Sequence, residues 1–119
     1  MAYVPLSYLQ IAGHLLDLRS GTLDAEALRH SAINRLYYAQ FLRARRYLRS
    51  RATRAVNHDA VINALRSEAV TEPASEYLRA LLALRNQCDY WDEVDIAVVD
   101  VELAWNLVRS LDAAMQGIW

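Results

Sequence analysis

SAINRLYYAQFLRARRYL, residues 31–48, is the stretch that decides the fold of this 119-residue chain. At 100° per residue, its large apolar side chains fall on one face, and arginines occupy the opposite face in its second half. The apolar face consists of Ile33, Tyr37, Phe41, Ala44 and Leu48. The first half is apolar nearly all round, which requires enclosure by other elements. The spacing therefore predicts a long helix that begins inside a core and ends at the surface with positive charge.

Apolar residues at helical spacing continue on both sides of this stretch. They predict helices at residues 5–18, 24–51, 57–69, 71–91 and 99–115. Asn57 and Thr71 are expected to cap the third and fourth of these helices. No segment alternates with period two for long enough to be a clear strand, although residues 95–99 are ambiguous. The predicted fold is all-α, an up-and-down bundle of four to five helices that forms a single domain over residues 1–119.

The composition is that of an ordinary globular chain. Hydrophobic residues make up 55% and charged residues 23%, and three glycines with two prolines argue against disorder or a turn-rich β fold. No apolar run is long enough to span a membrane and no secretory signal is recognisable, so we expect a cytoplasmic protein. A single cysteine, Cys88, and three histidines without metal-ligand spacing predict no disulfide, no metal and no cofactor.

Charge is unevenly distributed along the chain, although the net charge is −1. All 13 basic residues are arginine; nine lie between Arg29 and Arg66 with one acid among them, whereas two arginines and seven acids occupy the segment from Arg85 onward. The densest basic run contains Arg43, Arg45, Arg46, Arg49, Arg51 and Arg54, with Tyr47 among them. Such a run can neutralise several phosphates, and a tyrosine can stack on a base, which predicts nucleic-acid binding. The alternative is a solvated face, or one that pairs with the acidic C-terminal third of its own or a neighbouring chain.

Three polar side chains outside this run are candidates for chemistry. Arg85 precedes Asp89 by four residues, so the two can form an ion pair on one helix. Alternatively, Arg85 is a fixed cation for a phosphate, with Asn86 as its polar neighbour. His58 is expected at the start of the third helix, where it either titrates near neutral pH or simply begins the helix.

A set of spaced motifs resembles the HEPN family of small helical domains. The motifs are Ser31-x-x-Asn34-Arg35-x-Tyr37-Tyr38-Ala39-x-Phe41, Asn57-His58 and the segment LRNQCDY at residues 84–90. The resemblance covers the second to the fourth predicted helix. It implies a bundle that forms a homodimer with the fourth helices close to the two-fold axis. It also implies a role in a toxin–antitoxin or defence system, with RNA or a nucleotidyltransferase-type protein as the partner.

Active members of that family are metal-independent ribonucleases whose motif is an arginine, a polar residue and a histidine four to six residues further on. The resemblance places Arg85 and Asn86 at the first two motif positions, whereas Tyr90 and its successors occupy the histidine positions. In such chemistry a base deprotonates the ribose 2′-hydroxyl, and the arginine stabilises charge on the phosphate. The arginine is present, but the proton carrier is replaced by tyrosine.

Three functions are compatible with these residues. The first is an HEPN-like protein that binds RNA or a partner protein and lacks efficient nuclease activity, because the motif histidine is absent. The second is a metal-independent endoribonuclease that uses Arg85 with a displaced base, His58 or Asp89. Asn86 and Tyr90 are the other candidate residues of this site. The third is a structural dimeric adaptor in which the basic run of one chain meets the acidic segment of another.

Overall fold

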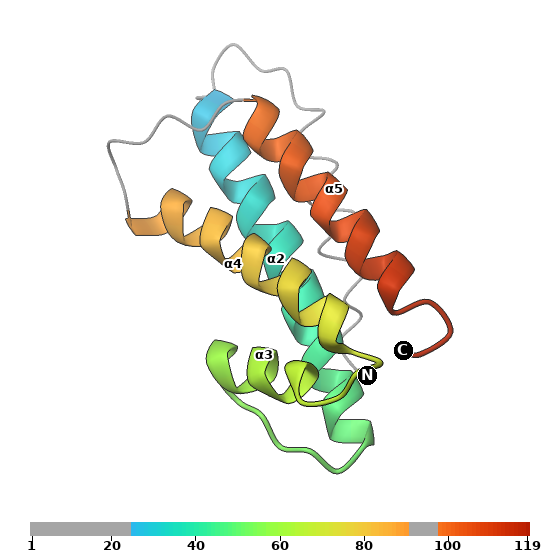
Figure 1. Cartoon of the computed structure of the whole chain (residues 1–119). Helices are drawn as coiled ribbons and strands as arrows, with labels where there is room; N and C mark the ends of the chain where they lie inside the picture. The colour runs from blue at the N-terminus through green and yellow to red at the C-terminus, as the bar shows by residue number, and fades with distance from the viewer. Residues whose placement is uncertain (1–24, 91–97) are drawn as a thin grey trace, which may run out of the picture.

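The computed structural model describes residues 25–90 and 98–119, and these form four α-helices (Figure 1). The helices are α2 (Ala25–Ser50), α3 (His58–Arg66), α4 (Glu72–Tyr90) and α5 (Val98–Ala114). The prediction of a small all-α bundle is confirmed. The helix predicted at residues 5–18 lies outside the described residues. Within the described ranges, none of the helices combines the length and the apolar character needed to cross a membrane.

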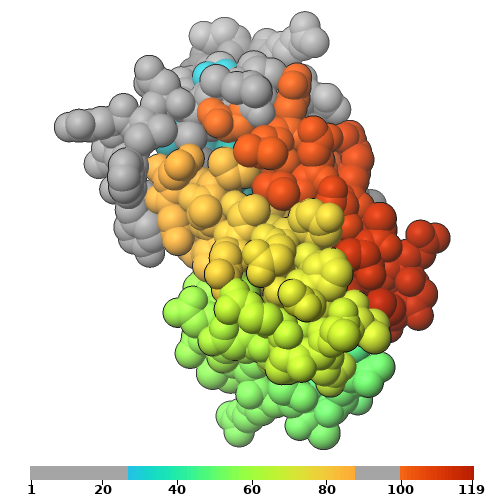
Figure 2. All heavy atoms as spheres, in the orientation of Figure 1, coloured from blue at the N-terminus to red at the C-terminus, as the bar shows by residue number. Residues whose placement is uncertain are grey.

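Helix α4 is the central packing element of the described part of the chain. It packs against α2, α3 and α5, and α2 also contacts α3 and α5. Helices α2 and α5 run in the same direction, α4 crosses over α2 in the opposite direction, and the short α3 crosses the C-terminal half of α2 (Figure 1). In the space-filling view, α4 and α5 cover the middle of α2 (Figure 2). Helix α3 thus packs against two longer helices, α2 and α4.

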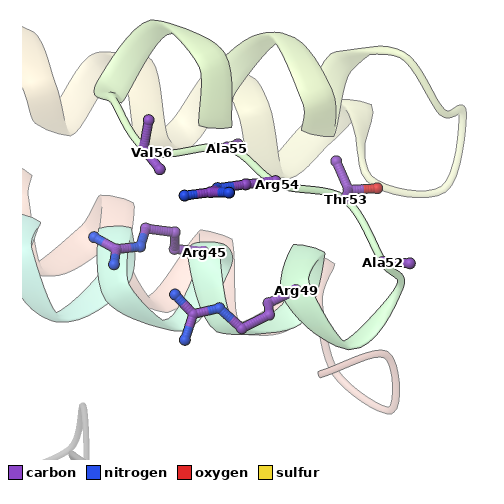
Figure 3. A pocket seen from close by; sticks show the side chains of 7 residues that line it. All are labelled: Arg45, Arg49, Ala52, Thr53, Arg54, Ala55 and Val56. Atoms are coloured by element: carbon purple, nitrogen blue, oxygen red, sulfur yellow. The ribbon is translucent and has the colours of Figure 1, made fainter.

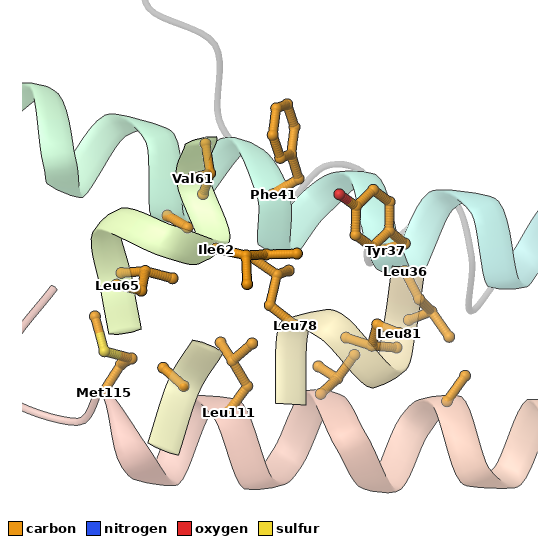
Figure 4. Packing of buried hydrophobic residues seen from close by; sticks show 14 of the residues in the cluster. Leu36, Tyr37, Phe41, Val61, Ile62, Leu65, Leu78, Leu81, Leu111 and Met115 are labelled. Atoms are coloured by element: carbon orange, nitrogen blue, oxygen red, sulfur yellow. The ribbon is translucent and has the colours of Figure 1, made fainter. Parts of the chain in front are cut away.

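The apolar face predicted for the central stretch is buried along its whole length. Ile33 and Tyr37 are fully buried, and Phe41, Ala44 and Leu48 are at most 5% exposed. The first half of α2 is enclosed on its other side as well, since Leu36 is also fully buried. Side chains from the other three helices and from the turn after α5 complete this core (Figure 4), among them Ile62, Leu65, Leu78, Leu81, Leu111 and Met115. Each large aliphatic side chain buried in this way contributes about 1.5–3 kcal/mol.

Helix α3 begins as predicted and ends earlier than predicted. The Asn57 side chain accepts a hydrogen bond from the Ala60 amide at 2.8 Å, which confirms Asn57 as the N-cap. The prediction that this helix reaches residue 69 is wrong, because it ends at Arg66 with Ser67 as its C-cap. The buried Thr71 hydroxyl donates to the carbonyl oxygen of Leu65, so the turn folds back tightly and α4 begins directly against α3.

The segment between α2 and α3 starts with a sharp turn at Ala52. The Thr53 amide donates to the Leu48 carbonyl at 2.9 Å, and the Ala52 amide donates to the Arg49 carbonyl at 3.0 Å. This pair of bonds is the Schellman arrangement, which places the residue after the helix in the left-handed region. Ala52 occupies that position with φ of 59°. The turn sends the chain back along α2 toward the start of α3.

Candidate active site and arginine pocket

His58, the first residue of α3, contacts side chains from two other helices. Its Nδ1 lies 2.6 Å from the hydroxyl oxygen of Tyr37 on α2. Its Nε2 lies 3.5 Å from the Nη1 atom of Arg85 on α4. The Arg85 guanidinium also lies over the Tyr37 ring, 5.8 Å from the ring centroid. We refer to these three residues as the His58 cluster.

Local structure fixes the position of the imidazole. The cap at Asn57 sets the first turn of α3, and Tyr37 belongs to the buried face of α2. The ring of Phe41, one turn after Tyr37, lies 4.7 Å from the His58 ring between centroids. Tyr37 and Phe41 are themselves stacked at 6.0 Å. Two aromatic rings of α2 therefore form a wall against which His58 is held.

The contact with Arg85 favours one tautomer of His58. A guanidinium can only donate hydrogen bonds, so its approach to Nε2 requires the Nε2 lone pair. The ring proton then resides on Nδ1 and is donated to the Tyr37 oxygen. In this tautomer the neutral imidazole presents an unprotonated Nε2 toward Arg85.

Electrostatics keep this imidazole neutral. Burial lowers the pKa of His58 below its ordinary value of 6.5, and the positive charge of Arg85 lowers it further, while Asp59 opposes both effects. Burial raises the pKa of Tyr37, so its phenol keeps its proton at neutral pH. Both His58 and Arg85 are partly exposed to solvent. The cluster therefore combines an accessible base with an adjacent fixed cation, the two groups needed to move a proton and to stabilise charge on a phosphate.

The structure brings together two of the predicted catalytic residues, Arg85 and His58. Asn86 is the next residue of α4 and is partly exposed. Asp89 and Tyr90 belong to the last turn of α4, but their side chains lie outside the described part of the structure. The predicted Arg85–Asp89 ion pair therefore stays a prediction.

Tyr37 is the member of the cluster that sequence reasoning missed. Its place on the apolar face of α2 suggested a core aromatic, and it is indeed fully buried. The signal that could have identified it is its hydroxyl, because a buried tyrosine hydroxyl needs a hydrogen-bond partner. In this structure Nδ1 of His58 supplies it.

A pocket of about 520 Å³ lies where α2 ends and the chain turns toward α3 (Figure 3). We call it the arginine pocket. The residues that line it are Arg45, Arg49, Ala52, Thr53, Arg54, Ala55 and Val56. None of these lining residues is acidic. Its three arginines form no ion pair with any described residue, so the pocket is a concentration of positive charge open to an anion.

Arg43, also predicted to contact nucleic acid, points elsewhere. It forms an ion pair with Asp112 of α5, and its guanidinium lies 4.2 Å from the centroid of the Trp119 ring. This contact matches the alternative that part of the basic run pairs with the acidic C-terminal third of its own chain. The cause is the packing of α5 along that side of α2.

The other members of the basic run occupy different surroundings. Tyr47 is only 7% exposed, and the guanidinium of Arg51 lies 5.2 Å from its ring centroid. This burial does not fit the predicted role of Tyr47 as a stacking surface for a base. Arg46 is exposed on α2 but does not line the arginine pocket. The candidate nucleic-acid surface of the described chain is therefore centred on Arg45, Arg49 and Arg54.

No known family model, curated protein or solved structure matches this chain. Membership of the HEPN family therefore stays a prediction based on the motifs. Among the residues that the structure describes, no group of three or more histidine, cysteine, aspartate or glutamate side chains is arranged to hold a metal ion.

Proposed function

We propose that this chain is an HEPN-like RNA-binding protein that cleaves RNA at the His58 cluster without a metal ion. The observation that carries the proposal is the 3.5 Å contact between His58 Nε2 and Arg85 Nη1. It supplies a proton carrier beside the arginine, which favours the displaced-base alternative over a protein without nuclease activity. The arginine pocket lies near the start of α3 and has no acidic lining residue, which supports RNA as the polyanionic substrate.

The proposed reaction is transesterification at a phosphodiester. As the Arg85 guanidinium turns from His58 to the phosphate, His58 Nε2 takes the proton of the ribose 2′-hydroxyl, and the resulting oxygen attacks the adjacent phosphorus. The bond from phosphorus to the 5′ oxygen breaks, and that oxygen takes up a proton from the imidazolium. Arg85 stabilises the added negative charge on the phosphate oxygens. The products are a 2′,3′-cyclic phosphate and a 5′-hydroxyl.

Tyr37 has a positioning role in this proposal. The Tyr37 oxygen accepts a hydrogen bond from Nδ1–H of His58. This bond keeps the lone pair on Nε2 and fixes the plane of the ring. General acid–base help of this kind typically accelerates a reaction by about 10²- to 10⁴-fold. We expect the loss of His58 to reduce cleavage by an amount in that range.

The HEPN resemblance adds further elements to the proposal. They are a homodimer, a nucleotidyltransferase-type partner protein, and a toxin–antitoxin or defence role. Each of these follows from the resemblance alone. The structural adaptor has less support, because the described ion pair of Arg43 with Asp112 lies within one chain.

The test is cleavage of a structured RNA by the purified protein in the presence of a chelator. We expect wild-type protein to produce 2′,3′-cyclic phosphate ends, and His58→Gln and Arg85→Gln to lose activity. Arg109→Gln is the matched control, because Arg109 is exposed on α5 and donates to Asn106 of the same helix. The same RNA with 2′-O-methyl groups must resist cleavage, since it lacks the nucleophile.

Two outcomes would contradict the proposed cleavage. One is the absence of cleavage by wild-type protein that binds the same RNA, which would leave a binding protein only. The other is equal cleavage by wild type and His58→Gln, which would point to a contaminating nuclease. Folding of each variant is checked by its far-UV circular dichroism and its thermal transition.

A further inference from the structure

We propose that the arginine pocket binds the terminal phosphate group of a nucleotide. This group occurs in two sources, a free nucleotide such as a nucleoside diphosphate and the phosphorylated 5′ end of an RNA. The inference goes beyond the cleavage reaction, because it concerns a separate group of residues: Arg45, Arg49 and Arg54.

The first argument is the number of charges. Three guanidiniums line the pocket, and none of its lining residues carries a negative charge. An internal phosphodiester carries one negative charge, whereas a terminal phosphate carries about −1.5 to −2 at pH 7. A pyrophosphate group carries more. A terminal phosphate or pyrophosphate therefore balances the pocket better than one internal phosphate of a strand.

The second argument is the arrangement of the three arginines. Arg45 and Arg49 are four residues apart, one turn apart on the same side of α2. The turn at Ala52 brings Arg54 back beside them, and the three guanidiniums extend toward the same side of the view (Figure 3). Planar forks from two elements can bind several oxygens of one phosphate group at once. The Thr53 hydroxyl lines the same pocket and adds a neutral donor.

The third argument is the apolar part of the pocket wall. Val56 is 61% exposed, an unusual state for a valine, and it lines the pocket together with Ala52 and Ala55. A bare inorganic anion would make no apolar contact with this surface, whereas a ribose or base attached to the phosphate can pack on it. The pocket volume of about 520 Å³ is also within the range of about 300–1,000 Å³ found for small-ligand sites.

The pocket lies close to the His58 cluster. Val56 precedes His58 by two residues, and the Arg45 guanidinium lies 6.0 Å from the centroid of the Phe41 ring, which packs against His58. An RNA whose 5′ end occupied the pocket would pass beside the cluster. That identification of the RNA end rests on the proposed function, whereas phosphate binding by the pocket does not.

Calorimetric titration tests the pocket without any cleavage step. The ligands are pyrophosphate, ADP and two RNAs of identical sequence built from 2′-O-methyl nucleotides, one with a 5′-phosphate and one with a 5′-hydroxyl. We expect at least one terminal-phosphate ligand to bind saturably, and the RNA with the 5′-phosphate to bind about tenfold more tightly than its 5′-hydroxyl counterpart if RNA is the source. Saturable binding of ADP with equal affinity for the two RNAs would identify the free nucleotide as the source.

Two double variants separate the pocket from general positive charge. Arg49→Gln with Arg54→Gln removes two of the three guanidiniums and should lower affinity for the bound ligand at least about tenfold. Arg66→Gln with Arg109→Gln removes the same charge from exposed positions outside the pocket and should change affinity less than about twofold.

The proposal is overturned if pyrophosphate and ADP show no saturable binding while the two RNAs bind equally. It is also overturned if the control double variant weakens binding as much as the pocket variant does. Because the RNAs resist cleavage, the absence of ribonuclease activity would not change the interpretation of either result. The proposed cleavage and the proposed phosphate pocket can therefore fail independently.

Discussion

The hydroxyl oxygen of Tyr37 lies 2.6 Å from Nδ1 of His58, so a fully buried residue of α2 holds a partly exposed residue at the start of α3. The contact joins the core to the candidate active site. It orients the imidazole so that its other nitrogen faces Arg85. The chemistry of His58 is thereby tied to the packing of α2 against α3.

Replacement of Tyr37 by phenylalanine should weaken both the fold and the site. The variant loses one hydrogen bond, and we expect the free energy of unfolding to fall by about 1 kcal/mol in urea titrations. The turnover rate of RNA cleavage should fall more than the affinity for the RNA, because the tautomer of His58 is no longer fixed. Tyr77→Phe is the control, since Tyr77 is partly buried on α4 and its hydroxyl has no hydrogen bond to a described residue. Equal effects of the two substitutions would contradict the positioning role.

The pH dependence of stability should carry a contribution from His58. Its pKa in the folded protein is below 6.5, the ordinary value for the unfolded chain. At a pH between these two pKa values the unfolded state binds more protons than the folded state, so lowering the pH favours unfolding. The stabilising contribution is therefore complete above pH 6.5 and is lost as the pH falls through the folded pKa. We expect the free energy of unfolding to decrease more steeply from pH 7 to pH 5 in wild type than in His58→Gln. Parallel pH profiles for the two proteins would refute the lowered pKa.

The pKa of His58 should respond to its charged neighbours in opposite directions. Arg85 lowers this pKa and Asp59 raises it, both to a smaller extent than burial does. Arg85→Gln should therefore raise the midpoint of the His58 imidazole titration observed by NMR, and Asp59→Asn should lower it further. A midpoint that does not move in Arg85→Gln would contradict the close contact between the two side chains.

Ala52→Gly should stabilise the protein. Ala52 has a φ of 59°, a conformation that costs a residue with a Cβ atom about 1–2 kcal/mol, whereas glycine adopts it freely. The gain is partly offset by the larger backbone entropy of glycine in the unfolded chain, so we expect a net increase of about 0.5–1 kcal/mol in the free energy of unfolding. Ala69→Gly, in the exposed turn between α3 and α4, should show only the entropic loss. A destabilised Ala52→Gly variant would argue against the left-handed turn.

Gln40→Met should be neutral or stabilising, although it removes a polar group. Gln40 is fully buried on α2, and neither N nor O of its side-chain amide has a hydrogen-bond partner among the residues that the structure describes. Burial of an unpaired amide costs about 1–3 kcal/mol in proteins, and methionine fills a similar volume without that cost. Thermal unfolding measures the effect, with the exposed Gln87→Met on α4 as the control. A loss of stability greater than that of the control would mean that the amide has a binding partner.

The core of α2 could be predicted from the sequence because helical periodicity is a local property. The positions of Ile33, Tyr37 and Phe41 on one face follow from their spacing, and all three are buried. The cap at Asn57 is equally local, because it depends on one side chain and the next turn.

The His58 cluster could not be predicted in the same way. His58 and Arg85 are separated by 27 residues, and their meeting depends on where the turn after Arg66 ends and how α3 crosses α2. The contacts of the Arg43 and Arg45 side chains likewise depend on how the helices pack. Only one residue separates them, but Arg43 pairs with α5 and Arg45 lines the arginine pocket. Sequence spacing places them on different sides of the helix without showing which side another element covers.

The three side chains of the His58 cluster come from three separate helices, and this has a consequence for how activity can be lost. A partly denatured chain can keep every helix and still have no catalyst, because the base, its orienting phenol and the cation are assembled only by tertiary packing. A binding partner that merely loosened α3 from its neighbours would abolish the proposed cleavage without unfolding the protein. Inhibition by such detachment would require no contact with the substrate at all.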